Sequence, residues 1–238
     1  MTLRWGVAPG LLAVILAGCA SEPAPAPTPV ERDTAVDPVV ALPDAYKLEF
    51  ENDYVKVVRV HYAVGAKLPE HIHPGGMTAY VYLNDNDGVI FDHAGGGERP
   101  YKRPPVKAGG ARFQTSTEEH HTLENISPTP SDFIRIWYKT DWADLAVPKR
   151  PVIRRRIAVS ETEYSNTATR ITRPAFEPGK PLVVPVSDHP SLIVAWPSGR
   201  HQWIDAKAPA SIPTGDAGTQ GFVRFEFLTA PVPPTRQP

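Results

Sequence analysis

Short runs in which hydrophobic and polar residues alternate recur along the chain from residue 54 to residue 228. This alternation is the period of a β-strand, and β-branched and aromatic residues strengthen it at residues 54–62. Turn-forming residues separate the runs, for example at residues 84–88 and in the glycine triplet at 95–97. Many short strands joined by turns, without helical periods between them, predict an all-β sandwich or barrel.

The expected strands fall into two groups with a similar rhythm, which predicts a weak internal duplication. The expected strands of the first group are residues 54–62, 77–83, 89–92, 111–114, 121–126 and 132–139. Those of the second group are residues 157–159, 167–172, 182–186, 192–196, 202–204 and 222–228. Between the groups, residues 142–156 carry one local basic cluster, which we interpret as a solvated connector rather than a nucleic-acid site because no stacking aromatics are interleaved with it.

The N-terminal region has a different pattern. Residues 7–18 are apolar, small or proline, a run too short to span a bilayer and typical of a secretory signal. The run ends in Leu16, Ala17 and Gly18 before Cys19, which resembles a bacterial lipobox; that resemblance implies cleavage after residue 18 and a lipid on Cys19. We therefore expect a signal peptide at 1–18, and a proline-rich extended linker at 19–44.

Composition narrows the class of function. The 238 residues carry a net charge of −1, and 21% of them are charged, so no strong field would recruit nucleic acid. The 28 prolines disfavour long helices. Because Cys19 is the only cysteine, neither an internal disulfide nor a cysteine-based zinc site can form within one chain.

Six of the eight histidines lie between residues 54 and 139, the region of the first group of strands, and two of them form the pattern His71-Ile72-His73. In an extended strand the side-chain period is two, so His71 and His73 point to the same face. Two imidazoles on one face, joined by a third from another strand, can bind one divalent ion. A His-x-His pair is also common on surfaces, so the wider context has to decide.

That context resembles the cupin family. Gly65, His71 and His73 match the start of the first cupin motif, and Gly110, His121 and Asn125 match positions of the second motif in the right order. The resemblance covers residues 46–139 and implies a jelly-roll barrel with a metal inside, held by His71, His73 and His121. Extended to the second group of strands, it implies two tandem barrels, at residues 45–145 and 146–238, of which the second is degenerate.

The sequence departs from the family pattern in both motifs, and the glycine that closes the first motif comes late, at Gly88. The carboxylate ligand of the first motif is replaced by Met77 or Thr78, and the proline and second glycine of the second motif by Ser116 and Glu118. A three-histidine set leaves coordination positions open for water or substrate, as in catalytic zinc and non-haem iron sites. We therefore expect Fe, Mn, Zn or Ni; a barrel whose pocket is empty or merely polar is the alternative.

The other polar candidates are weaker. Glu118 and Glu119 precede the third histidine and are candidate proton carriers. His120 should point away from the site, and His93 is expected on the surface of a loop. In the second group of strands His189 stands where a first motif would lie, but its second histidine is missing, so a structural or interface role is expected there.

Taken together, the sequence predicts an envelope-tethered bacterial lipoprotein whose cupin domain binds one divalent metal. If the protein is an enzyme, the resemblance suggests oxygenase- or isomerase-type chemistry on a small polar molecule. A non-catalytic protein that binds a metal or small ligand, or a structural scaffold, is the alternative. Cupins often dimerise through barrel edges, so a homodimer is consistent with the resemblance, and the signal predicts localisation in the cell envelope.

Overall fold

The computed structural model describes residues 37–93, 99–116, 118–139, 152–153, 161–214 and 218–231. By its packing the chain divides into Met1–Asp33 and Thr34–Pro238, and every described residue belongs to the second unit. The predicted signal peptide, Cys19 and the expected strand at 157–159 lie outside the described residues. The predicted domain boundaries at 18, 44 and 145 stay predictions.

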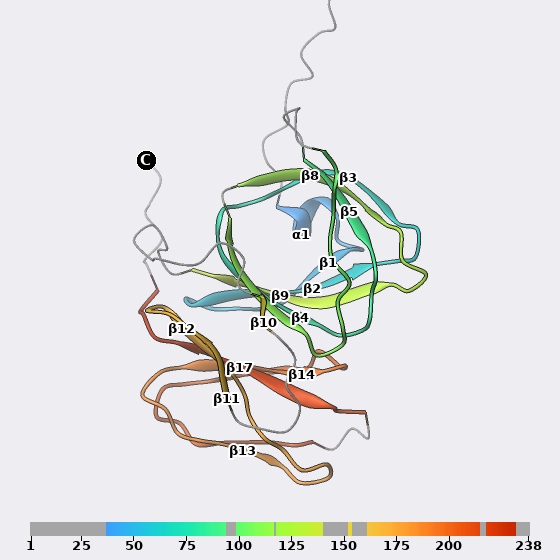
Figure 1. The fold of residues 1–238 in the computed structure, drawn as a ribbon. Coiled ribbons are helices and arrows are strands. Elements are labelled where there is room, and N and C mark those ends of the chain that lie inside the picture. The colour runs from blue at the N-terminus through green and yellow to red at the C-terminus, as the bar shows by residue number, and fades with distance from the viewer. Residues whose placement is uncertain are drawn as a thin grey trace, which may run out of the picture. The chain divides into compact units, whose positions relative to one another are not determined.

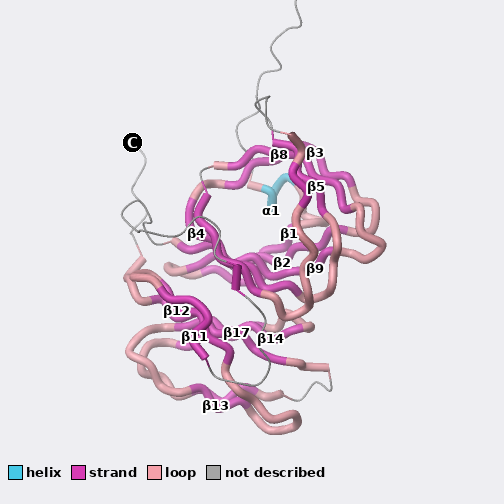
Figure 2. The backbone as a smooth tube through the Cα atoms, viewed as in Figure 1, coloured by secondary structure: helices cyan, strands magenta, loops and turns pink. Residues whose placement is uncertain are grey.

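The first β-domain is a sandwich of two antiparallel sheets (Figures 1 and 2). The larger sheet has the strand order β1 (Tyr46–Glu51), β2 (Val55–Tyr62), β9 (Ser131–Tyr138), β4 (Gly76–Tyr82), β7 (Ala111–Ser116) and β10 (Val152–Ile153). The smaller sheet has the order β3 (Lys67–His73), β8 (Glu119–Asn125), β5 (Val89–His93) and β6 (Tyr101–Lys102). Neighbouring strands come from distant parts of the sequence, as in a jelly roll.

The second β-domain is smaller. Its main sheet has the order β11 (Glu161–Ser165), β12 (Thr169–Arg173), β17 (Gly221–Phe227), β14 (Ser191–Trp196) and β15 (His201–Ile204). A two-stranded sheet pairs β13 (Leu182–Val184) with β16 (Ala210–Ile212). Leu182, Ile193 and Phe222 belong to a separate core between these two sheets. The expected all-β architecture is confirmed, and the second pair of sheets is consistent with the expected arrangement of two tandem barrels.

Strand β4 is buried along its whole length, because both faces of the larger sheet are covered. One face carries Tyr80 and Tyr82 into the interior of the first sandwich. The opposite face carries Met77, Ala79 and Val81, which belong to one apolar core together with residues of β12, β14 and β17. The second domain thus supplies the apolar cover for the outer face of the larger sheet.

A short helix, α1 (Pro38–Ala41), precedes β1. The Asp37 side chain accepts a hydrogen bond from the Val39 amide and caps this turn, and Asp37 also pairs with Lys56 of β2. Val39 and Leu42 pack against the core of the first sandwich. Residues 37–44, which we expected at the end of the linker, therefore fold onto the barrel. Among the described residues, no helix has the length and apolarity needed to cross a membrane.

The shared core between the two domains generates a stability prediction. Phe225 of β17 is fully buried in it, so Phe225→Ala should lower the free energy of unfolding by about 3–5 kcal/mol. Val183 is 74% exposed, and Val183→Ala serves as the control with an expected loss below about 0.5 kcal/mol. Denaturant unfolding measures both values, and equal losses in the two variants would contradict the packing described.

Candidate metal centre

The pairing of β3 with β8 places the first histidine of the cluster. Leu68 lies opposite Leu123 and His71 lies opposite His121, so three steps along β3 match two steps along β8. This bulge at residues 69–70 inserts one extra residue into β3. Without it, His71 would oppose His120 and point to the other face of the sheet, since a one-residue slip exchanges the faces. The bulge therefore aims His71 into the sandwich.

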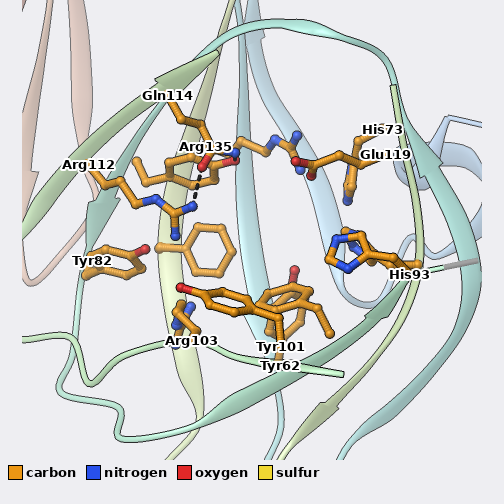
Figure 3. Close-up of a pocket in the computed structure, with 14 residues that line it drawn as sticks. Tyr62, His73, Tyr82, His93, Tyr101, Arg103, Arg112, Gln114, Glu119 and Arg135 are labelled. Atoms are coloured by element: carbon orange, nitrogen blue, oxygen red, sulfur yellow. Dashed lines mark hydrogen bonds between the residues drawn. The ribbon is translucent and has the colours of Figure 1, made fainter. Parts of the chain in front are cut away.

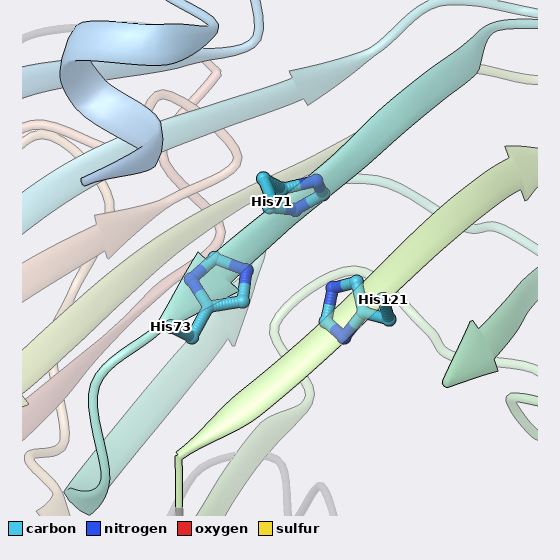
Figure 4. Close-up of side chains that lie close together, drawn as sticks. All are labelled: His71, His73 and His121. Carbon is cyan, nitrogen blue, oxygen red and sulfur yellow. The ribbon is translucent and has the colours of Figure 1, made fainter. Parts of the chain in front are cut away.

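Three imidazoles meet inside the first sandwich as a result (Figure 4). His73 shares the inward face with His71, and His121 faces both from β8. One ring nitrogen from each lies within 4.8 Å of the others, and all three side chains are buried. Donors around one ion, each about 2.1 Å from it, lie roughly 3.0–3.4 Å apart, so the rings would have to turn inward to share an ion.

A hydrogen bond fixes the ring of His71. The Nδ1 atom lies 2.8 Å from the carbonyl oxygen of Pro69 in the bulge. A carbonyl only accepts, so Nδ1–H donates, and Nε2 of the neutral ring keeps its lone pair. This arrangement, in which a backbone carbonyl orients the ring, is typical of metal-binding histidines.

The hydroxyl of Tyr46 on β1 points at the cluster. It donates to His71 Nε2 at 2.9 Å and lies 3.5 Å from His73 Nε2. Because its proton is used there, its oxygen accepts from the hydroxyl of Tyr62, 2.7 Å away. Burial raises the pKa of Tyr46 well above its ordinary value, so the phenol stays protonated.

The other two histidines have fewer partners, because among the described residues only Nε2 of His73 has one, the Tyr46 hydroxyl at 3.5 Å. Among the described residues, both ring nitrogens of His121 and Nδ1 of His73 are buried without a hydrogen-bond partner. Burial lowers the pKa of His121 to about 3 and that of His73 well below its ordinary value, and the nearby Arg135 guanidinium adds to the effect at His73. Unpaired polar atoms in a buried site are costly. Neutral imidazoles with free lone pairs suit a bound cation, so the donor set fits a divalent metal.

A pocket opens beside the cluster (Figure 3). It encloses about 590 Å³, part of it open to solvent, and His73 and His121 form part of its wall. Six aromatic side chains line it, namely Tyr62, Tyr80, Tyr82, Phe91, Tyr101 and Phe133. The remaining lining residues are His93, Arg103, Arg112, Gln114, Glu119 and Arg135. A ligand in this pocket would lie against two of the three histidines of the cluster.

The structure separates the two carboxylates that the sequence singled out. Glu119 lines the pocket, whereas Glu118 is exposed and accepts a hydrogen bond from His120 Nε2 at 2.8 Å. His120 lies opposite Ile72, on the face of β8 away from the cluster. Only Glu119 is therefore placed to exchange a proton with a ligand in the pocket.

His93 lies elsewhere than expected. It is not on the surface of a loop: it ends β5, pairs with His121 across β8, and its ring lies 5.5 Å from that of His121. The strand continues one residue beyond the predicted end at 92, because β5 follows β8 as far as His121. In the second domain, Nδ1 of His201 lies 3.6 Å from Oε2 of Glu49. Among the described residues, the group of side chains that could hold a metal ion consists of first-domain histidines only.

Sequence reasoning missed three residues of the site. Tyr46 belongs to β1, a strand that the pattern did not predict, and it stands 25 residues before its partner His71. Arg112 and Arg135 alternate with apolar neighbours in their strands and were counted as strand residues only. An inward-facing arginine in an otherwise apolar strand was the one available signal.

Comparison with known proteins addresses the fold. AerE from Microcystis aeruginosa aligns over 78% of this chain and 98% of its own, with a TM-score of 0.51 and 10% identity. The bacterial pirin YhhW from Escherichia coli, solved in complex with nickel(II), aligns over 79% of this chain and 91% of its own, with a TM-score of 0.51 and 14% identity. No protein-family model and no curated protein sequence matches the chain.

A cupin domain from Bordetella pertussis Tohama I aligns over 39% of this chain and 90% of its own, at 17% identity, with a TM-score of only 0.34. All these identities are low, so the likeness concerns architecture. The likeness to AerE and YhhW, together with the strand order of the first sandwich, shows that the chain has a double-stranded β-helix (jelly-roll) fold.

The buried imidazoles predict acid sensitivity of the metal-free protein. The pKa of His121 is about 3 in the folded chain against 6.5 in the unfolded chain, so below pH 6.5 only the unfolded chain takes up this proton. Stability should fall as the pH decreases from 6.5 towards 3, and His121 alone should cost about 2 kcal/mol by about pH 5.

Denaturant unfolding with a chelator present measures this dependence. His121→Leu should flatten the slope, whereas His189→Leu, outside the cluster, should keep it. An unchanged slope in His121→Leu would show that this imidazole is not buried in its neutral form.

Proposed function

We propose that the chain binds one divalent metal ion through His71, His73 and His121, next to a pocket that receives a small polar molecule. The observation that carries this proposal is the meeting of three buried imidazoles, of which His73 and His121 form part of the pocket wall and carry buried nitrogens without hydrogen-bond partners among the described residues. Fe, Mn, Zn and Ni all accept imidazole ligands, so the donor set is compatible with each. The nickel(II) in the YhhW structure, a protein of the same fold, supports a divalent ion.

Tyr46 is the best candidate for a fourth protein donor. The cupin carboxylate is absent here, and the described residues place the Tyr46 hydroxyl 2.9 Å and 3.5 Å from the Nε2 atoms of His71 and His73. Two donors of one ion lie about 3.0–3.4 Å apart, so these distances match the spacing of neighbouring ligands. A bound cation would lower the pKa of the phenol, as it does for bound water.

The pocket favours an enzyme over a purely structural protein. A divalent ion would supply Lewis-acid chemistry at the pocket wall. The protein's own groups would do the rest: the aromatic walls would orient the ligand and exclude water, and Glu119 would hold or move a proton at its carboxylate. Oxygenase- or isomerase-type chemistry on a small molecule fits this arrangement. Binding without turnover is the alternative.

The metal proposal is tested by elemental analysis of the untagged chain purified without added metal. About one metal per chain is expected in the wild type, and none in the His71→Ala/His73→Ala/His121→Ala variant, with unchanged circular dichroism. A wild-type protein that is empty and also refuses Fe, Mn, Zn and Ni on titration would refute the metal site.

Tyr46→Phe extends the same experiment. With Cu(II) or Fe(III) as a probe, a phenolate ligand gives a charge-transfer band in the visible range, which should disappear in Tyr46→Phe. Tyr62→Phe, which removes only the neighbouring hydroxyl, should retain the band. A loaded wild-type protein without such a band would exclude Tyr46 as a ligand while leaving the histidine site intact.

We further propose that the protein is a lipoprotein of the bacterial envelope. The support is the apolar run at 7–18 followed by Cys19 and the proline-rich segment. Several acyl chains, at about 0.8 kcal/mol per buried CH₂, would hold it firmly to a membrane. In detergent phase separation of bacterial cell extracts the wild type should partition into the detergent phase and Cys19→Ser into the aqueous phase; identical partitioning would contradict the anchor.

A further inference from the structure

Arg135 carries a buried positive charge that nothing in the proposed metal centre uses. Its side chain comes from β9 and is only 4% exposed. The guanidinium lies over the ring of Trp137 at 4.4 Å and over that of Tyr80 at 5.6 Å. Among the described residues, Nε and Nη2 have no hydrogen-bond partner, and no carboxylate forms an ion pair with Arg135.

Strand register places a second arginine beside the first. Arg135 pairs with Tyr80 across β9 and β4, and Tyr80 pairs with Arg112 across β4 and β7. The three residues therefore form one row across the larger sheet, and all three line the pocket. Figure 3 shows the two arginines at the pocket. Arg112 lies over the same ring of Tyr80, at 5.6 Å. Tyr80 thus separates two guanidinium groups that point into one cavity.

The other charges of the pocket do not neutralise this pair. Arg103, 3% exposed, also lines the pocket, and its Nη2 donates to Asn86 Oδ1 at 2.8 Å and Ser131 Oγ at 3.0 Å, both uncharged. Arg112 donates to the uncharged side chain of Gln114. Glu119 is the one acid among the fourteen lining residues, so three guanidinium groups face a single carboxylate. A guanidinium cannot lose its proton, and a buried charge without a counterion is costly.

We propose that this pocket binds the carboxylate of a small ligand with an apolar or aromatic body, and that Arg135 anchors that carboxylate. The planar guanidinium edge matches a carboxylate with two parallel hydrogen bonds. The six aromatic side chains of the wall suit a flat or apolar body rather than a strongly hydrated one. The inference deepens the proposed function, because it gives a substrate class to the pocket beside the candidate metal.

The test uses the full chain freed of metal with a chelator, so that no metal ion can hold the carboxylate. Calorimetric titration compares benzoate with benzamide, its neutral near-isostere, and with inorganic phosphate. Benzoate should bind the wild type, and benzamide and phosphate should each bind at least about tenfold more weakly. Failure of benzoate to bind at millimolar concentrations, or equal binding of benzamide, would overturn the proposal. Preferential binding of phosphate would also overturn it.

Variants assign the anchor. Arg135→Gln should weaken benzoate binding at least about tenfold, whereas Arg99→Gln, the same change at an exposed position outside the pocket, should leave it unchanged. Arg135→Lys keeps the charge without the planar edge and should also bind more weakly than the wild type. Unchanged affinity in Arg135→Gln would refute the anchor. If that variant fails to fold, the comparison of benzoate with benzamide and the affinity of Arg135→Lys for benzoate decide whether Arg135 anchors the carboxylate.

The same titrations separate this inference from the metal proposal. Benzoate binding that depends on Arg135 in a chain that binds no metal would uphold the carboxylate site and refute the metal centre. A chain that binds metal through its histidines but does not bind benzoate would uphold the metal centre and refute the carboxylate site.

Discussion

The candidate site depends on one feature of strand pairing, the bulge at residues 69–70 of β3. Because this bulge adds one residue, His71 faces His121 inside the sandwich. The carbonyl oxygen of Pro69, in the bulge, accepts a hydrogen bond from His71 Nδ1 and so directs Nε2 of the ring at the cluster. Without the bulge, His71 and His73 would turn to the other face of the sheet, and neither the cluster nor its contact with Tyr46 would form. A local irregularity of the backbone thus positions the chemistry.

The site also gathers buried polar groups without partners, and their burial costs free energy that the packing around the site must offset. Buried imidazoles without partners and a buried guanidinium without a counterion lie within one sandwich. Both faces of the larger sheet are covered, one by this polar interior and the other by the apolar core shared with the second domain. In this view the second domain serves the site indirectly, because its apolar contacts offset the cost of a polar interior. The unsatisfied groups then account for what the site would bind, a cation at the imidazoles and an anion at Arg135.

Much of the fold and of the histidine cluster could be predicted from the sequence. The residues that could not be predicted share a physical cause, which is that they reach the site through pairing between distant strands. His71 and His73 are found by spacing along the chain, because a strand fixes which side chains share a face, and the resemblance to the cupin motifs adds Gly65, Gly110, His121 and Asn125. Tyr46 and Arg135 could not be found in this way, because they reach the site through pairings between distant strands. His93 was misplaced for the same reason, since its partner His121 belongs to another strand. Glu118 and Glu119 are adjacent in the sequence, and only the start of β8 decides which of them enters the pocket.

The central claim is that three imidazoles of one chain share a metal ion. X-ray absorption at the zinc edge of the zinc-loaded protein tests it most directly. The account predicts nitrogen and oxygen donors at about 2.0–2.1 Å, with the multiple scattering of three imidazole rings. A spectrum without imidazole scattering, or one that is unchanged in the His71→Ala/His73→Ala/His121→Ala variant, would contradict the account.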